Sequence, residues 1–324
     1  MSDHLAATDN GGKSWYLVGA AFPFDNGPLG YSQVEFMTLE DGYAFGPAGL
    51  AVTHDAGRHW TEAVGLTGAL QRVVPIGNDV WATEITCNGP PVATTSCSVE
   101  LAISTDAGLI WQQVPGAMPL SEARSGGDIL ARLTTTAAYV VSYGPTGGGL
   151  VLTTDAGRRW TRLPDPCEHW QRVDVATPSD TDLWMICGGP PVLAGTASSK
   201  AVFRSYDGGK QWSLVASTGF GPPFGPGALH APTGPVGSIA YAGQLSQLAT
   251  ISASRAWIGV SGVGVLVSFD YGRDWTLASG IEDDGHDTGV GVTFNDAVHG
   301  WAIEFHQGVF KTDNGLQWTL VDGT

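Results

Sequence analysis

The sequence predicts an all-β fold, a seven-bladed β-propeller of four-stranded antiparallel blades, and three observations carry this prediction. First, an octet of the form (S/T)-x-D-x-G-x-x-W recurs seven times, and its tryptophans are separated by 43 to 63 residues. This period is typical of a unit of four strands. Second, a short apolar run containing an aromatic residue precedes each of the last six octets. Third, helical periodicity is absent over any useful window.

Each octet is expected to be a tight turn. The seven copies occupy residues 8–15, 53–60, 104–111, 153–160, 205–212, 268–275 and 311–318. A short aspartate side chain accepts hydrogen bonds from its own turn, the glycine two residues later supplies a positive φ, and the tryptophan buries a large ring. Seven copies in a pseudo-symmetric ring cannot share one active site. We therefore assign a structural role to Asp55, Asp106, Asp155, Asp207, Asp270 and Asp313.

The expected blade consists of strand a, strand b with its aromatic residue, strand c, the octet and strand d, so that the octet forms the c–d turn. The aromatic residues of strand b are Tyr43, Trp81, Tyr139, Trp184, Trp257 and Trp301. Runs rich in aromatic and β-branched residues and bounded by Gly, Asp, Asn or Pro favour strands. The whole chain, residues 1–324, is then expected to form one domain.

Two octets depart from the pattern, because Asn10 replaces the first aspartate and Lys311 replaces the last hydroxyl residue. The first octet begins at residue 8, with no strand a or b before it. We expect seven blades with an incomplete first blade, or a chain that extends further in its natural form. The alternative is six complete blades and an N-terminal hairpin.

These features resemble the Asp-box (BNR) repeat of the sialidase superfamily, and more closely the seven-bladed propellers of the photosystem II assembly and stability factor type. Residues 299–318, HGWAIEFHQGVFKTDNGLQW, show the order of strand, strand and box that the family has. Sortilin-like receptors and two-domain xyloglucanases are more distant relatives in this resemblance. It implies the propeller fold over essentially the whole chain. It does not fix a function, because enzymes, receptors and assembly factors all carry the box.

The cysteines indicate an oxidising compartment. Cys87 and Cys97 form one local pair and Cys167 and Cys187 the other, and neither pair has the C-x-x-C spacing of a zinc or redox site. We expect two disulfides and a secreted, periplasmic or cell-surface protein. No apolar run is long enough to span a membrane, and the sequence begins with no signal peptide, so export would require a segment outside it.

The formal net charge of −16 argues against nucleic acid and anionic membranes as partners. Arg72, Arg132 and Arg172 occupy similar places in three expected strands a. In a propeller these strands line the central channel, where the arginines could hold a carboxylate or an acidic segment of a partner. Pairing with neighbouring acidic side chains is the simpler interpretation.

Sialidase chemistry is not expected. In the family that the chain resembles, it requires an Arg-Ile-Pro motif, and the nearest string here is Phe203-Arg204-Ser205. Another glycosidase would still need two carboxylates about 5 to 10 Å apart. The candidates outside the octets are Glu35, Glu84, Glu304, Asp283, Asp284 and Asp287. No cofactor is expected, although the three aspartates at 283–287 could hold calcium.

A ligand is expected on the face opposite the octets, where the long connections 19–34, 87–98, 188–200, 217–245 and 278–289 lie. Tyr241 and His286 are candidate ligand contacts in these connections. We therefore expect a monomeric, non-catalytic binding or assembly propeller for a protein or carbohydrate partner. The alternative is a glycoside hydrolase, other than a sialidase, with a carboxylate pair in the central pocket.

Overall fold

The computed structural model describes most of the chain, and the described part contains β-strands and no helix. The described residues are 5–19, 33–46, 49–87, 96–116, 118–123, 127–143, 148–168, 170–192, 197–219, 236–239, 243–281, 289–304 and 306–322. None of them belongs to a helix long and apolar enough to cross a membrane. The chain divides into two compact units, Met1–Ser142 with Leu150–Arg162 (unit 1), and Tyr143–Gly149 with Leu163–Thr324 (unit 2). That residues 1–324 form one domain stays a prediction.

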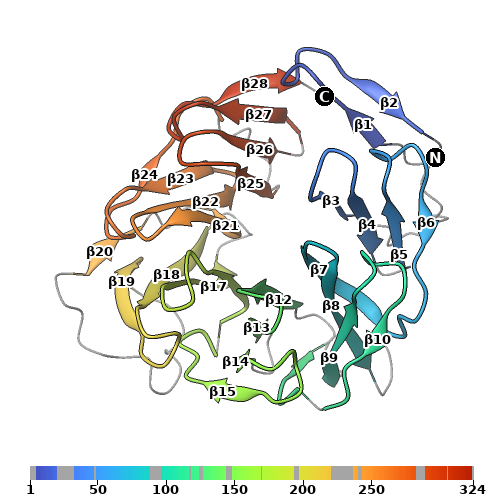
Figure 1. Cartoon of the computed structure of the whole chain (residues 1–324). Coiled ribbons are helices and arrows are strands. Elements are labelled where there is room, and N and C mark those ends of the chain that lie inside the picture. The colour runs from blue at the N-terminus through green and yellow to red at the C-terminus, as the bar shows by residue number, and fades with distance from the viewer. Residues whose placement is uncertain are drawn as a thin grey trace. The chain divides into compact units, whose positions relative to one another are not determined.

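Unit 1 contains a two-stranded hairpin, two sheets and most of a third (Figure 1). The hairpin pairs β1 (Leu5–Ala7) with β2 (Tyr16–Val18). The first sheet comprises β3 (Gln33–Phe36), β4 (Gly42–Gly46), β5 (Gly49–Thr53) and β6 (Thr61–Glu62). The second comprises β7 (Ala69–Ile76), β8 (Asp79–Cys87), β9 (Ser96–Ser104) and β10 (Gln112–Gln113), with β11 (Ser121–Ala123) paired to β9. The third comprises β12 (Gly127–Arg132), β13 (Ala138–Tyr143), β14 (Gly149–Thr153) and β15 (Thr161–Leu163).

Unit 2 contains three further sheets with the same strand order. The first comprises β16 (Arg172–Ala176), β17 (Leu183–Val192), β18 (Ala197–Ser205) and β19 (Ser213–Ser217), with β20 (Gly237–Ser238) added parallel to β19. The second comprises β21 (Gln244–Ser252), β22 (Arg255–Ser261), β23 (Gly264–Ser268) and β24 (Thr276–Leu277). The third comprises β25 (Val290–Phe294), β26 (Gly300–Glu304), β27 (Gly308–Thr312) and β28 (Thr319–Asp322).

The predicted fold class is confirmed: the protein is an all-β propeller built of small antiparallel sheets of four sequential strands. Six such sheets are present among the described residues, and the first octet connects the two strands of the β1–β2 hairpin. This arrangement is the alternative description, six complete blades and an N-terminal hairpin. The aromatic run GYAFG coincides with β4, and it is buried except at its last residue.

Hydrogen bonds within the octets explain why this sequence repeats. In the octet after β5, the Asp55 carboxylate accepts the His59 amide at 2.8 Å, and the Thr53 hydroxyl accepts the Gly57 amide at 2.9 Å. The same two bonds recur in the four following octets. In the first octet Asn10 replaces the aspartate and still accepts the Ser14 amide at 3.0 Å, because an amide oxygen is also an acceptor.

The last octet differs from its predicted alignment by one residue. The Thr312 hydroxyl accepts the Gly315 amide at 2.8 Å, and the Asn314 side chain accepts the Leu316 and Gln317 amides, both at 2.8 Å. Asn314, not Asp313, therefore takes the place of the aspartate. Thr312 supplies the hydroxyl that the alignment had lost at Lys311. The turn is one residue shorter, since only Gly315 has a positive φ there.

The octet glycines allow neighbouring sheets to approach closely. A Cβ atom on Gly108 would lie 2.6 Å from the Tyr43 ring, and one on Gly315 would lie 2.7 Å from the Trp257 ring. The Tyr43 hydroxyl donates a hydrogen bond to the Ala107 carbonyl, and the Trp257 indole donates one to the Gly315 carbonyl. The aromatic residue of strand b thus caps the octet of the next sheet within each unit.

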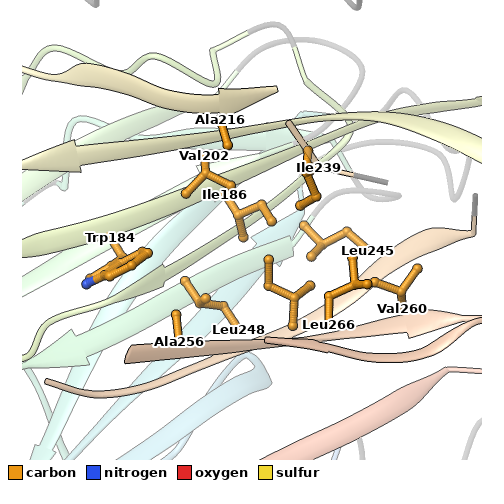
Figure 2. Packing of buried hydrophobic residues seen from close by; sticks show 11 residues of the cluster. Trp184, Ile186, Val202, Ala216, Ile239, Leu245, Leu248, Ala256, Val260 and Leu266 are labelled. Carbon is orange, nitrogen blue, oxygen red and sulfur yellow. The ribbon is translucent and has the colours of Figure 1, made fainter. Parts of the chain in front are cut away.

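Apolar clusters between consecutive sheets form the core of each unit. Figure 2 shows one in unit 2, where Ile186 and Val202 of the β16–β20 sheet face Leu245, Leu248 and Leu266 of the next sheet. A cluster between the first two sheets of unit 1 contains Tyr43, Phe45, Leu70, Val73 and Trp111. Burial of this apolar surface, rather than the hydrogen bonds, is the main source of stability.

Both predicted disulfides are present. Cys87 and Cys97 are opposite each other on β8 and β9, and Cys167, in the turn before β16, joins Cys187 on β17. The predicted connection 188–200 is wrong in its extent, because β17 continues to Val192 and β18 begins at Ala197. Pairing of Gly188 with Lys200 and of Val192 with Ala197 makes this segment a long hairpin.

Candidate functional site

Glu84 is engaged within its own sheet. It lies on β8 in unit 1, is fully buried, and accepts hydrogen bonds from the amides of Thr67 and Gly68 at 2.9 and 2.8 Å. Its second carboxylate oxygen accepts a hydrogen bond from the Gln113 side chain. Both oxygens therefore hold the segment before β7 and the outer strand β10 in place, which is a structural role.

Glu304 also binds backbone amides. It lies at the end of β26 in unit 2, is 4% exposed, and one of its oxygens accepts the amides of His306 and Gln307 at 2.8 and 2.7 Å. The carboxylate therefore closes the β26–β27 turn. Like Glu84, Glu304 therefore has a structural role, because backbone amides occupy its carboxylate.

Arg72 differs from these carboxylates because its charged group has no direct partner. It lies half-buried on β7, and among the described residues it makes no hydrogen bond and no ion pair. A β-bulge between Leu70 and Arg72 interrupts the pairing with β8 and places Arg72 opposite Thr83. Bulges commonly re-aim a side chain beside a functional site.

Asp128 is the residue that the sequence prediction missed. It is the second residue of β12, is 3% exposed, and both of its oxygens are buried without a hydrogen bond. Burial raises the pKa of Asp128 to about 6, while the nearby Thr83 hydroxyl and the Arg72 charge oppose this rise. The Thr83 hydroxyl is near enough to favour the ionised form but does not reach hydrogen-bond geometry.

Glu35 is the second carboxyl group on which the charge of Arg72 acts. It lies on β3, and its side chain is accessible to solvent. Partial desolvation of the carboxyl group nevertheless raises the pKa of Glu35, and the positive charge of Arg72 partly opposes that rise. Arg72, Thr83, Asp128 and Glu35, here named the Arg72 site, come from three consecutive sheets of unit 1. The site combines an uncommitted guanidinium with two carboxyl groups, so it offers both donors and acceptors to a ligand.

Arg132 is not part of this site. It is the last residue of β12, whereas Asp128 and Arg72 lie nearer the beginning of their strands. Its guanidinium pairs with Asp79, donates to the Val74 and Asp79 carbonyls at 3.0 and 2.7 Å, and stacks 4.4 Å from the Trp81 ring. Arg132 therefore fastens β12 to the β7–β8 hairpin.

The remaining candidates cannot be joined to the Arg72 site. Arg172 begins β16 in unit 2, and its side chain lies outside the described residues. Tyr241, His286, Asp283, Asp284 and Asp287 also lie outside the described residues, so the calcium site stays a prediction. Among the residues that are described, no three potential metal ligands form a cluster.

A groove of about 700 Å³ lies elsewhere in unit 1, lined in part by Asp79, Asp106, Ile110 and Arg158. Asp79 is paired with Arg132, and Asp106 accepts the Ile110 amide within its octet. These carboxylates therefore have structural partners, and the groove offers a ligand fewer unpaired polar groups than the Arg72 site does.

No family model and no curated protein matches the chain. Solved structures do match: YCF48 bound to D1 peptide is 14% identical, with a TM-score of 0.54 over 89% of this chain and 79% of that chain. YCF48 from Cyanidioschyzon merolae is 15% identical, with a TM-score of 0.52 over 88% and 82% of the two chains. An ancestral GH74 enzyme is 11% identical, with a TM-score of 0.52 over 96% of this chain and 50% of that chain. Because such identities show the fold alone, they confirm that this chain has the propeller fold seen in YCF48 and GH74 enzymes.

Proposed function

We propose that this protein is an extracytoplasmic, monomeric, non-catalytic binding propeller that recognises a segment of a partner protein at the Arg72 site. The observation that carries the proposal is the half-buried Arg72, whose guanidinium makes no hydrogen bond or ion pair among the described residues, whereas the Arg132 guanidinium in the neighbouring sheet pairs with Asp79 and donates to two backbone carbonyls. A half-buried cation without a direct partner is costly, and a ligand that accepts its hydrogen bonds would remove that cost.

The polar groups of the Arg72 site favour a ligand that has both hydrogen-bond donors and hydrogen-bond acceptors. Arg72 would donate to a carbonyl or carboxylate, and the accessible Glu35 would accept from an amide or an amine. At neutral pH two carboxyl groups surround one arginine, so a purely acidic segment is a poor match. A segment of mixed charge is a better one. The structure of YCF48 bound to D1 peptide supports the use of this fold for binding a peptide.

Two further parts of the proposal rest on the same features. The two disulfides support a location in an oxidising compartment. The octets are proposed to be structural Asp-boxes, since their aspartates accept hydrogen bonds from backbone amides of the same turn. Neither part depends on the identity of the ligand.

Binding of labelled decapeptides tests the proposal. Fluorescence anisotropy would compare acidic, basic, mixed-charge and neutral peptides of the same length. We expect the mixed-charge peptide to bind most tightly, and Arg72→Gln and Glu35→Gln each to weaken it about tenfold, the usual effect of losing a charge-assisted hydrogen bond. Arg158→Gln, at an exposed octet arginine, is the matched control. Equal affinity in Arg72→Gln and the unmodified protein would contradict the proposal.

A glycoside hydrolase is the second candidate, because Glu35 and Asp128 both have a raised pKa beside one arginine. Two carboxyl groups in different environments are the usual machinery of glycosidases. Against it, the Asp128 oxygens are sealed from solvent and cannot reach a substrate in this conformation. Release of reducing sugar from polysaccharides, abolished in Asp128→Asn, would favour the enzyme over the binding module.

A further inference from the structure

Two exposed tyrosines form a patch on unit 2 that the Arg72 site does not explain. Tyr206, in the octet after β18, is 58% exposed, and Tyr271, in the octet after β23, is 48% exposed. Both ring centroids lie near the same atom, the guanidinium carbon of Arg204, at 4.9 and 6.0 Å. The two rings therefore belong to one area of surface, here named the tyrosine patch.

Arg204 holds this patch from beneath. Its side chain is fully buried, pairs with Asp182, and donates to the carbonyls of Ala253 and Tyr271 at 2.6 and 3.4 Å. It also stacks 3.9 Å from the Trp184 ring. Because buried contacts fix the guanidinium, the rings that pack on it keep a defined position while their outer faces meet solvent.

The backbone of Tyr271 is in an unfavourable conformation for its residue type. Its φ is +68°, a left-handed value that disfavours a bulky side chain. The equivalent positions of other octets carry Ala56, Ala107 and Ala156, or Gly208. The tyrosine carries the same positive φ as these alanines, and glycine is the residue that avoids its conformational cost. The positive φ is therefore a property of the octet turn, and the bulky exposed ring is what distinguishes this copy.

The need to cover a buried arginine does not account for the rings. Arg132 in unit 1 is held in the same way, because it stacks on Trp81, pairs with Asp79 and donates to backbone carbonyls. Trp81 is its only aromatic partner among the described residues. An arginine at the edge of a strand b tryptophan is therefore stable without exposed tyrosines, and the rings at Arg204 serve another purpose.

We propose that the tyrosine patch binds a neutral polysaccharide chain. Pyranose rings present faces of C–H groups that pack flat against tyrosine rings, and the same two turns carry the exposed hydrogen-bond donors Lys210 and Arg273, which suit sugar hydroxyls. The exposed area of two rings is on the order of 200 Å², well below the roughly 800 Å² that a stable protein partner requires. The net charge of −16 repels acidic polymers, which leaves neutral ones.

Affinity electrophoresis in native gels tests this second site. The full chain would be run in gels containing hydroxyethylcellulose, galactomannan or a β-1,3-glucan, and in gels without polymer. We expect retardation by at least one polymer, and about fivefold weaker binding in Tyr206→Ala and in Tyr271→Gly, as for the loss of one stacked ring. Tyr271→Gly should keep or raise Tm, because glycine adopts the positive φ freely.

The controls separate the patch from the fold and from the Arg72 site. Tyr16→Ala removes a tyrosine that is 53% exposed in unit 1 and should bind as the unmodified protein does. Arg72→Gln should also leave polysaccharide binding unchanged, so failure of one site does not imply failure of the other. Absence of retardation by all three polymers would overturn the proposal. Unchanged retardation in a Tyr206→Ala, Tyr271→Gly double variant would also overturn it.

Discussion

Arg72 and Arg132 lie on the first strands of neighbouring sheets, yet the structure uses them in opposite ways. Arg132 ends β12, where the β7–β8 hairpin offers the Asp79 carboxylate, two carbonyls and the Trp81 ring. Arg72 sits behind a bulge in the middle of β7, makes no direct pair among the described residues, and lowers the pKa of Glu35 and of Asp128 through its charge. The position of an arginine along its strand thus decides whether neighbouring groups of the fold can engage its guanidinium.

The largest effect is expected from Arg132→Ala. The change leaves the half-buried Asp79 and two carbonyls without their donor and exposes the Trp81 ring, which should lower the free energy of unfolding by about 3 kcal/mol. Urea denaturation measures this loss. Arg158→Ala, at an exposed arginine in the next octet, should change stability by less than about 0.5 kcal/mol. Equal losses of unfolding free energy in the two variants would contradict the structural role assigned to Arg132.

Asp128→Asn is expected to have the next largest effect, with the opposite sign. The folded pKa of about 6 lies above the unfolded value near 3.8, so between these pH values the folded state binds more protons. The carboxyl group therefore costs no stability at pH 4 and lowers stability as the pH rises through 6. Asparagine removes this titration, so the variant should gain up to about 3 kcal/mol over the unmodified protein at pH 7.5.

The pH profile of the difference is the decisive measurement for Asp128. Unfolding free energies of both proteins would be compared from pH 4 to pH 7.5, and the gap should widen in favour of the variant. A constant gap would mean that Asp128 does not titrate in this range. It would also contradict the raised pKa of Asp128 in the Arg72 site.

The sequence predicted the strands and turns well because their causes are local. The aromatic and apolar composition of GYAFG, the positive φ at Gly57 and the hydroxyl and carboxylate spacing of Thr53 and Asp55 all act within a few residues. The one error in the octets, Asp313 for Asn314, arose because adjacent aspartate and asparagine can both fill the acceptor position.

The site was less predictable because it depends on register between distant strands. Glu84 and Glu35 look alike in sequence, but only the structure shows that Thr67, Gly68 and Gln113 engage the first. Asp128 follows two glycines, a pattern typical of a turn, so the sequence did not indicate a buried carboxyl group there. The only signal for it was an acidic residue directly before the apolar run ILA, where β12 becomes buried.

Glu84→Ala extends the comparison to two glutamates, one engaged by the fold and one without a hydrogen bond in the described structure. It leaves the amides of Thr67 and Gly68 without their acceptor, and because these amides are only partly buried the loss should be about 1 to 2 kcal/mol. Glu35→Ala removes an accessible carboxyl group that has no hydrogen bond in the described structure, so its effect should stay near zero. Thermal denaturation of the two variants side by side measures the contrast. A larger loss for Glu35→Ala would contradict the assignment of these two glutamates.

The smallest effect on stability is expected from Arg72→Gln, and this is the most telling result. No hydrogen bond or ion pair is lost among the described residues, and removal of a costly half-buried cation offsets the loss of its attraction to the two carboxyl groups, so the free energy of unfolding should change by less than about 0.5 kcal/mol. Removal of the positive charge leaves Glu35 and Asp128 without an opposing cation, so both should bind protons more readily. NMR titration of the two carboxyl groups should then show a higher pKa for each in the variant. A stable variant with raised carboxyl pKa values and lost peptide binding would establish that Arg72 is held for a ligand, whereas a large loss of stability would place it with Arg132 as part of the fold.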